Sequence, residues 1–167
     1  TIDTSETALP PCAFTRTGYE MVGWSNSVYW AKHATVIADG ATVKGEDFWN
    51  GTAKDFNGKL FAQWKANRHF VTCDLGNGTW PTAGYEPPAE ATCDQVFSLP
   101  APTRAGYGFI GWKVTAGLDP STAKWGDGND PSSPIGKDTL CINGDKEVYF
   151  KNLNPTNAAA VTLTAQW

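Results

Sequence analysis

Long apolar runs are missing from this sequence, so we predict no membrane insertion in this segment. The start of the chain also lacks the charged and apolar regions of a signal peptide. Charged residues make up only 18% of the chain, the net charge is −4 and no basic stripe occurs. Proteins that bind nucleic acids carry such a stripe. We therefore expect no nucleic-acid partner.

Motifs of catalytic and cofactor sites are also missing. The chain has no nucleophile elbow, zinc-protease helix, phosphate loop or dinucleotide fingerprint. Its two histidines, His33 and His69, have neither a neighbouring nucleophile nor the spacing of zinc ligands. The acidic stretch 127–130 lacks the length and terminal Glu of an EF-hand loop. We predict no enzyme activity, no cofactor and no metal site.

Cysteine is scarce and never paired as Cys-x-x-Cys, which disfavours a zinc site. The four cysteines are Cys12, Cys73, Cys93 and Cys141. They are either small buried apolar residues or members of disulfides in an exported protein. Cys73 and Cys93 flank a turn-rich stretch, where a disulfide would add about 3 kcal/mol of stability. We predict a disulfide in the second half of the chain, with Cys141 competing for the same partners.

Glycine, proline and large aromatic residues are abundant. Seventeen glycines and eleven prolines are typical of many short strands joined by turns. Eight Trp and eight Phe supply the large buried areas that small cores need. We therefore predict a mainly β fold, with an α+β fold as the alternative.

An internal repeat sets the organisation of the chain. The tripeptide Ala-Gln-Trp occurs twice, and each copy closes a segment containing Thr-Arg-x-Gly-Tyr and then Gly-Trp. The turn motifs and the Gly-Trp motifs are each 88 positions apart. The motif residues are Gly18, Tyr19, Gly23, Trp24 and Trp64 in the first copy, and Gly106, Tyr107, Gly111, Trp112 and Trp167 in the second. A repeat of this kind predicts two tandem modules, residues 1–66 and 67–167.

The two copies differ in length and at their beginnings. The second is 15 residues longer between its Gly-Trp and its final Trp, which predicts a surface insertion at about 115–146. The first lacks an equivalent of the predicted strand 69–75. That strand would come from upstream sequence, from residues 1–8 or from another molecule.

Alternation and turn signals predict further elements. We expect strands at 21–24, 60–64, 69–75, 96–97, 109–114, 147–150 and 161–167, and loops at 80–94 and 115–138.

The motif residues have physical interpretations. Gly18 and Gly106 permit a positive φ in a turn. Gly23 and Gly111 mark a bulge or a close backbone approach. We expect the motif tryptophans to pack within their own units. The other four, Trp30, Trp49, Trp80 and Trp125, pack in cores or together form a platform for sugars.

The ordered motifs resemble the Listeria–Bacteroides repeat, also called the internalin B-type B repeat. This resemblance covers most of residues 69–167 and about residues 15–64. It implies tandem modules with a ubiquitin-like β-grasp fold on bacterial cell-surface or secreted proteins, without catalysis. The implied partners are other proteins: neighbouring repeats, like subunits or a host surface molecule.

Three functions follow as hypotheses. The first is a stalk, spacer or adhesion module. The second is a subunit of an extracellular filament or pilus, in which a neighbour adds a strand, from residues 1–10 for example, to an incomplete sheet. The third is a carbohydrate-binding module that uses surface tryptophans.

Overall fold

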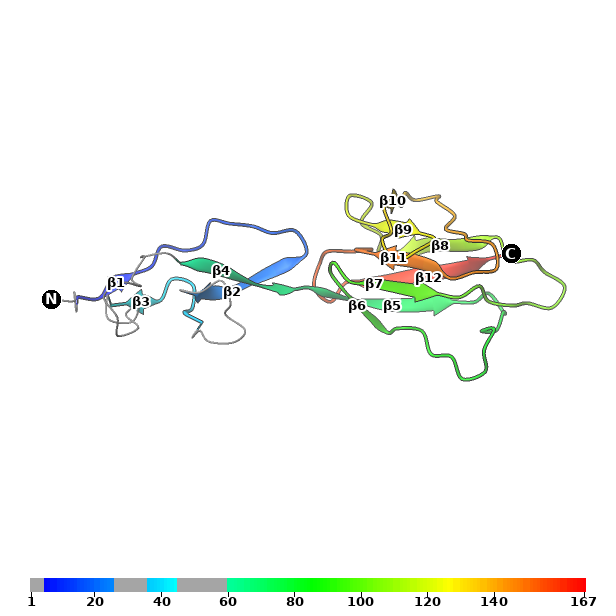
Figure 1. The fold of residues 1–167 in the computed structure, drawn as a ribbon, viewed down its shortest axis with the longest axis horizontal. Coiled ribbons are helices and arrows are strands. Elements are labelled where there is room, and N and C mark those ends of the chain that lie inside the picture. The colour runs from blue at the N-terminus through cyan, green and yellow to red at the C-terminus, as the bar shows by residue number, and fades with distance from the viewer. Residues whose placement is uncertain (1–4, 26–35, 45–59) are drawn as a thin grey trace. The chain divides into compact units, whose positions relative to one another are not determined.

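A computed structural model describes residues 5–25, 36–44 and 60–167 (Figure 1). The chain forms two compact units, Thr1–Lys65 and Ala66–Trp167. The regular elements of the described ranges are all strands, and no helix occurs in them. The predicted mainly β fold is therefore confirmed, whereas the finer β-grasp arrangement stays a prediction.

The described part of the first unit contains four strands. They are β1 (Thr7–Ala8), β2 (Tyr19–Ser25), β3 (Thr42–Val43) and β4 (Phe61–Ala66). Strand β1 pairs antiparallel with β3, and β2 pairs with β4. The strands predicted at 21–24 and 60–64 correspond to β2 and β4.

The second unit consists of two four-stranded sheets, with the strand orders β6-β5-β12-β8 and β10-β9-β11-β7 (Figure 1). The parallel pair is β5 with β12, and the other pairs are antiparallel. The strands are β5 (Arg68–Asp74), β6 (Glu90–Thr92), β7 (Val96–Leu99), β8 (Gly111–Ala116), β9 (Lys124–Gly126), β10 (Ser133–Pro134), β11 (Val148–Lys151) and β12 (Ala160–Gln166).

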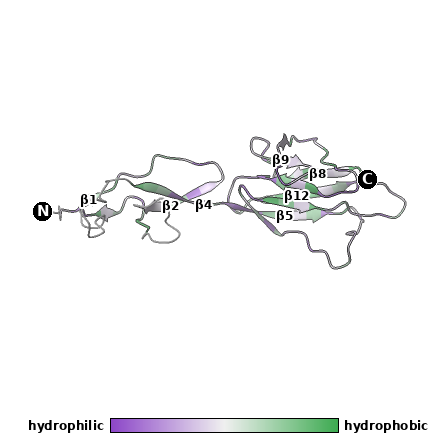
Figure 2. Cartoon of the chain, in the orientation of Figure 1, coloured by the Kyte–Doolittle hydropathy of each residue, from purple (hydrophilic) through white to green (hydrophobic). Residues whose placement is uncertain are grey.

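The core of the second unit follows from the two-residue period of its strands. Along β12 the side chains of Val161, Leu163 and Ala165 are buried, and the residues between them are partly exposed. Figure 2 shows hydrophobic residues, coloured green, along the strands of the second unit. These residues join Trp112 and Phe150 in one apolar cluster.

Two predicted loops contain strands. The stretch 80–94 includes β6, and the stretch 115–138 includes β9 and β10. Ala123, which precedes β9, and Ile135, which follows β10, are buried in the core. These short strands form because they pair with longer neighbours, since tertiary pairing outweighs weak local preference.

Candidate interaction surface

The Thr-Arg-x-Gly-Tyr motif forms the same turn in both units. Each turn comprises four residues, 16–19 and 104–107, and the tyrosine N–H donates to the arginine carbonyl at 3.0 and 3.1 Å. The glycine has a φ of 79° in both copies, as the motif predicts. The motif therefore specifies a backbone conformation as well as a sequence.

Each turn stacks its arginine on its tyrosine. The guanidinium carbon of Arg16 lies 3.6 Å from the ring centre of Tyr19, and that of Arg104 lies 3.7 Å from the ring centre of Tyr107. Tyr107 is 57% exposed, so its stacked pair faces solvent. Arginine and tyrosine are the side chains that most often dominate binding at protein interfaces.

The Gly-Trp motif forms the same backbone bridge in both units. Trp24 pairs antiparallel with Ile37, through N–H···O distances of 2.7 and 2.8 Å. Trp112 pairs in the same way with Cys141, with both distances at 2.8 Å. Ile37 and Cys141 therefore occupy equivalent positions, although their sequence contexts share no motif.

The glycine before each tryptophan allows the bridging backbones to approach. Gly23 has a φ of 147° and Gly111 a φ of 135°. A Cβ at Gly23 would lie 2.5 Å from the carbonyl oxygen of Ile37, and one at Gly111 would lie 3.0 Å from that of Cys141. A side chain at either position would therefore disturb the bridge.

Exposed apolar side chains gather around these turns and bridges. We define the repeated surface as the half-buried Tyr19 with the exposed Val22 and Val36 in the first unit, and the exposed Tyr107, Ile110, Leu140 and Ile142 in the second. Val22 and Ile110 precede the two glycines, and Val36 and Leu140 precede the two bridge partners. Of the eight exposed large apolar or aromatic side chains in the described ranges, six belong to this surface. This concentration makes the repeated surface a candidate contact site.

Sequence reasoning missed most of the repeated surface. Tyr19 and Tyr107 belong to the motif, but the aliphatic members were unassigned or placed in strands. Their exposure depends on which face of the strand they occupy, and the unusual φ of the neighbouring glycine interrupts simple alternation. The feature that could have revealed these residues is the pairing of Trp24 and Trp112 with their bridge partners, because Val36 and Leu140 precede those partners.

The motif tryptophans of the second unit, Trp112 and Trp167, pack within that unit. Trp112 is fully buried. Phe109 makes edge contacts with Trp112 and with Trp167, at ring-centre distances of 5.7 and 5.8 Å. The indole N–H of Trp167 donates to the carbonyl of Leu75 at 3.0 Å. Trp64, in β4, is partly buried.

Trp24 has a polar partner. Its indole N–H donates to Asp39 Oδ1 at 3.0 Å, and the backbone N–H of Cys12 donates to both oxygens of that carboxylate at 2.9 and 3.0 Å. The bond from Cys12, followed by that from Trp24, lowers the pKa of Asp39. The charged carboxylate thus holds residues 12, 24 and 39 together.

The predicted disulfide is absent, and the four cysteines are free thiols. Strand register explains why Cys73 and Cys93 do not pair. The N–H of Cys93 donates to the carbonyl of Asn67, and Cys73 lies six residues further along the same strand direction. At roughly 3.3 Å per residue the two are on the order of 20 Å apart, whereas a disulfide needs Cα atoms within about 7 Å.

Cys141 is also too far from the other candidates. It lies beside Trp112 of β8, and β12 separates β8 from β5, which carries Cys73. Three strand spacings amount to roughly 14 Å. Cys93 lies at the opposite edge of this sheet. Burial raises the pKa of Cys73 to about 11 and that of Cys141 to about 12, so both are neutral. Cys141 is a small buried residue, the alternative that the sequence left open, and Cys73 is partly buried.

The tryptophans proposed for sugar binding have other contacts. Trp80 lies 4.9 Å from Tyr85 and 5.8 Å from Trp112, measured between ring centres. Trp80 and Trp125 both pack against the core. Trp30 and Trp49 lie outside the described residues, as does His33.

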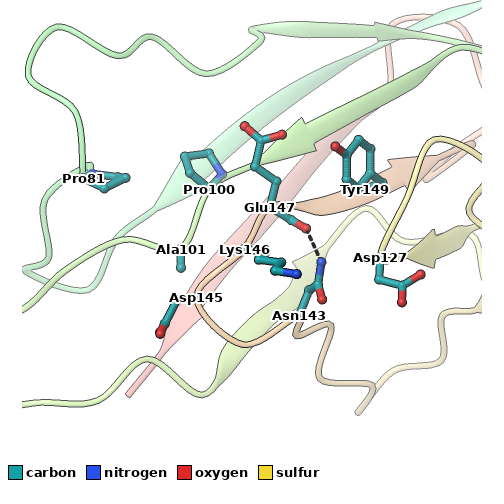
Figure 3. A pocket seen from close by; sticks show the side chains of 9 residues that line it. All are labelled: Pro81, Pro100, Ala101, Asp127, Asn143, Asp145, Lys146, Glu147 and Tyr149. Carbon is teal, nitrogen blue, oxygen red and sulfur yellow. Dashed lines mark hydrogen bonds between the residues drawn. The ribbon is translucent and has the colours of Figure 1, made fainter.

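A shallow pocket of about 420 Å³ lies on the second unit (Figure 3). Its lining is Pro81, Pro100, Ala101, Asp127, Asn143, Asp145, Lys146, Glu147 and Tyr149. Asn143 donates to the carbonyl of Glu147 at 2.9 Å, and the carboxylate of Glu147 accepts from Ser98 at 3.0 Å. No group of three potential metal ligands occurs in the described ranges. We assign no chemistry to this pocket.

Comparison with known proteins gave no match to a family model, to a curated protein or to a solved structure. The resemblance to the Listeria–Bacteroides repeat therefore stays a prediction that rests on the repeated motifs. Within the described part of the chain, no helix is long and apolar enough to span a membrane.

Proposed function

We propose that this chain is a non-catalytic tandem-repeat module of a bacterial cell-surface or secreted protein, and that it adheres to like modules through the repeated surface. The supporting observation is that both units expose apolar side chains at equivalent positions around the same turn and bridge. Repeat proteins present such surfaces at regular intervals, so weak contacts add along the array.

The chemistry of the repeated surface favours a protein partner. Val22, Ile110 and Leu140 offer aliphatic area without hydrogen-bonding groups, and the stacked pairs add Arg and Tyr. Protein interfaces are rich in Arg, Tyr and buried apolar groups. Sugars need polar side chains around an exposed aromatic ring, and Trp80 and Trp125 both pack against the core.

Adhesion between like modules is testable with beads coated with the chain. We expect the beads to aggregate, because identical apolar surfaces on facing beads bury each other. A chain with Tyr19→Ala, Val22→Ser, Tyr107→Ala and Ile110→Ser is expected to lose most of this aggregation while it keeps its circular dichroism. Phe70→Ala is the matched control, since Phe70 is exposed outside the repeated surface. Dispersed beads with the unaltered chain would refute the proposal.

Filament assembly by strand addition has less support. The proposed donor segment includes Thr7 and Ala8, which already pair with Val43 and Thr42 in the same chain. Donation to a neighbour would break these pairs. Fibres in negative-stain electron micrographs of the purified chain would restore this alternative.

A further inference from the structure

His69 is an unusual residue in the second unit because it is polar and almost completely buried. It is the second residue of β5, opposite Ala91 of β6, and only 1% of its surface is exposed. Neither ring nitrogen has a well-formed hydrogen bond in the described part of the chain, and the ring has a weak contact with the backbone of Asn154. A buried polar group that lacks a good hydrogen bond is destabilising.

No charged side chain compensates a proton on this ring. Strand β12 has no charged residue, and neither does the segment 152–159. Glu90 of β6 is exposed and bonded to Arg68 at 2.7 Å. The buried thiol of Cys93 follows β6 on the same inward face, and burial, followed by the charge of Asp94, raises its pKa. The thiol therefore stays neutral.

The remaining charged side chains near β6 and in the facing sheet, Asp94 and Lys151, are directed away from the His69 ring. Asp94 is exposed and accepts a hydrogen bond from Asn152 at 3.0 Å. In the facing sheet, β11 buries Val148 and Phe150, so alternation directs Lys151 to the other face. A protonated His69 would thus be a buried cation without a charged partner, which is unfavourable.

The backbone around His69 holds the start of β5 in place. Ala158 donates to the carbonyl of Arg68, and Phe70 donates to the carbonyl of Ala159, both at 2.7 Å. The side-chain amide of Asn67 donates to the carbonyl of Pro155 at 2.8 Å. A charge on the His69 ring would therefore disturb the contacts that hold the first strand of the second unit in place.

We propose that protonation of His69 releases the start of β5 from β6 and from residues 155–159, so that the second unit has an acid-sensitive first strand. Burial lowers the pKa of His69 below its ordinary value of 6.5, and a weaker interaction with the Asn154 backbone opposes this. The unfolded chain takes up the proton first as the pH falls. The stability of the closed strand is therefore full well above pH 6.5 and declines as the pH falls through that value.

Hydrogen–deuterium exchange of the full chain tests this inference. After correction for intrinsic rates, we expect the β5 amides to exchange about tenfold faster at pH 5.5 than at pH 7.5. At pH 5.5, one unit below the ordinary pKa of histidine, His69 of the opened strand binds a proton, and this favours opening by about that factor. We expect His69→Phe to remove the pH response and His33→Gln to keep it. Unchanged β5 protection at pH 5.5, or an unaltered response in His69→Phe, would overturn the proposal.

A direct titration keeps the inference testable if His69→Phe does not fold. The ring resonances of His69 in the unaltered chain, followed by nuclear magnetic resonance, report its pKa. We expect a value below 6.5, the ordinary value for histidine. A value at or above it would contradict the inference.

Discussion

Gly111 is a position where one added atom, the Cβ of a side chain, would disturb the second unit. Its φ of 135° is one that side chains rarely adopt, and a Cβ would lie 3.0 Å from the carbonyl oxygen of Cys141. We expect Gly111→Ala to lower the free energy of unfolding by about 2–4 kcal/mol, from backbone strain and crowding together. Urea unfolding measures this value.

Gly108→Ala is the matched control for Gly111→Ala. A Cβ at Gly108 would meet no atom within 4 Å, and its φ is not positive. We expect a change within about 0.5 kcal/mol, which is usual for a surface substitution. Equal losses in the two variants would show that the bridge beside Gly111 is not the cause.

Residues whose roles depend on local backbone could be predicted from the sequence, and those whose roles depend on register could not. The positive φ of Gly18 and Gly106 follows from their place in a turn motif. The pairing of Cys73 with Cys93 was a reasonable inference from their spacing along the chain. It fails because strand pairing places Cys93 opposite Asn67 at the far end of β5.

At the scale of elements, the insertion in the second unit is part of its core. Trp112 and Cys141 are separated by 29 positions, whereas the equivalent Trp24 and Ile37 are separated by 13, so the insertion amounts to 16 residues. It contributes β9 and β10, which extend the sheet beside β11. The sequence predicted an insertion here and described it as a surface loop.

Ile135 tests whether the insertion stabilises the unit. This side chain is 1% exposed, and its N–H donates to the carbonyl of Ala123 at 3.2 Å. We expect Ile135→Ala to cost about 2–5 kcal/mol of unfolding free energy, as a buried truncation does. Thermal and urea unfolding provide the measurement. Leu140→Ala, at a 41% exposed position, serves as the control and is expected to cost far less. Similar costs would contradict a structural role for the insertion.

Long strands could be predicted more reliably than short ones. The alternation in 69–75 and 161–167 reports one buried face, and β5 and β12 match these ranges to within one residue at each end. Strands β6, β9 and β10 have two or three residues each. Two or three residues are too few to display the alternation of a strand, so pairing with neighbouring strands determines whether these strands form.

At the scale of the whole molecule, the repeat predicted two units, and the structure divides the chain at Lys65. The two units differ in length, since Thr1–Lys65 has 65 residues and Ala66–Trp167 has 102. A shorter unit buries a smaller fraction of its surface on folding. The sequence predicted this difference in length, because the second copy of the repeat carries an insertion.

This difference predicts unfolding in two steps. Each unit is a separate compact body, and the stability of a small unit follows the apolar area that it buries. We expect the amides of β2 and β4 to lose exchange protection at lower urea concentration than those of β8 and β12. Pulsed hydrogen exchange across a urea series, read by mass spectrometry, distinguishes the two transitions. Gly111→Ala provides the internal control, since it should move the later transition alone. A single midpoint shared by all four strands would mean that the units unfold as one.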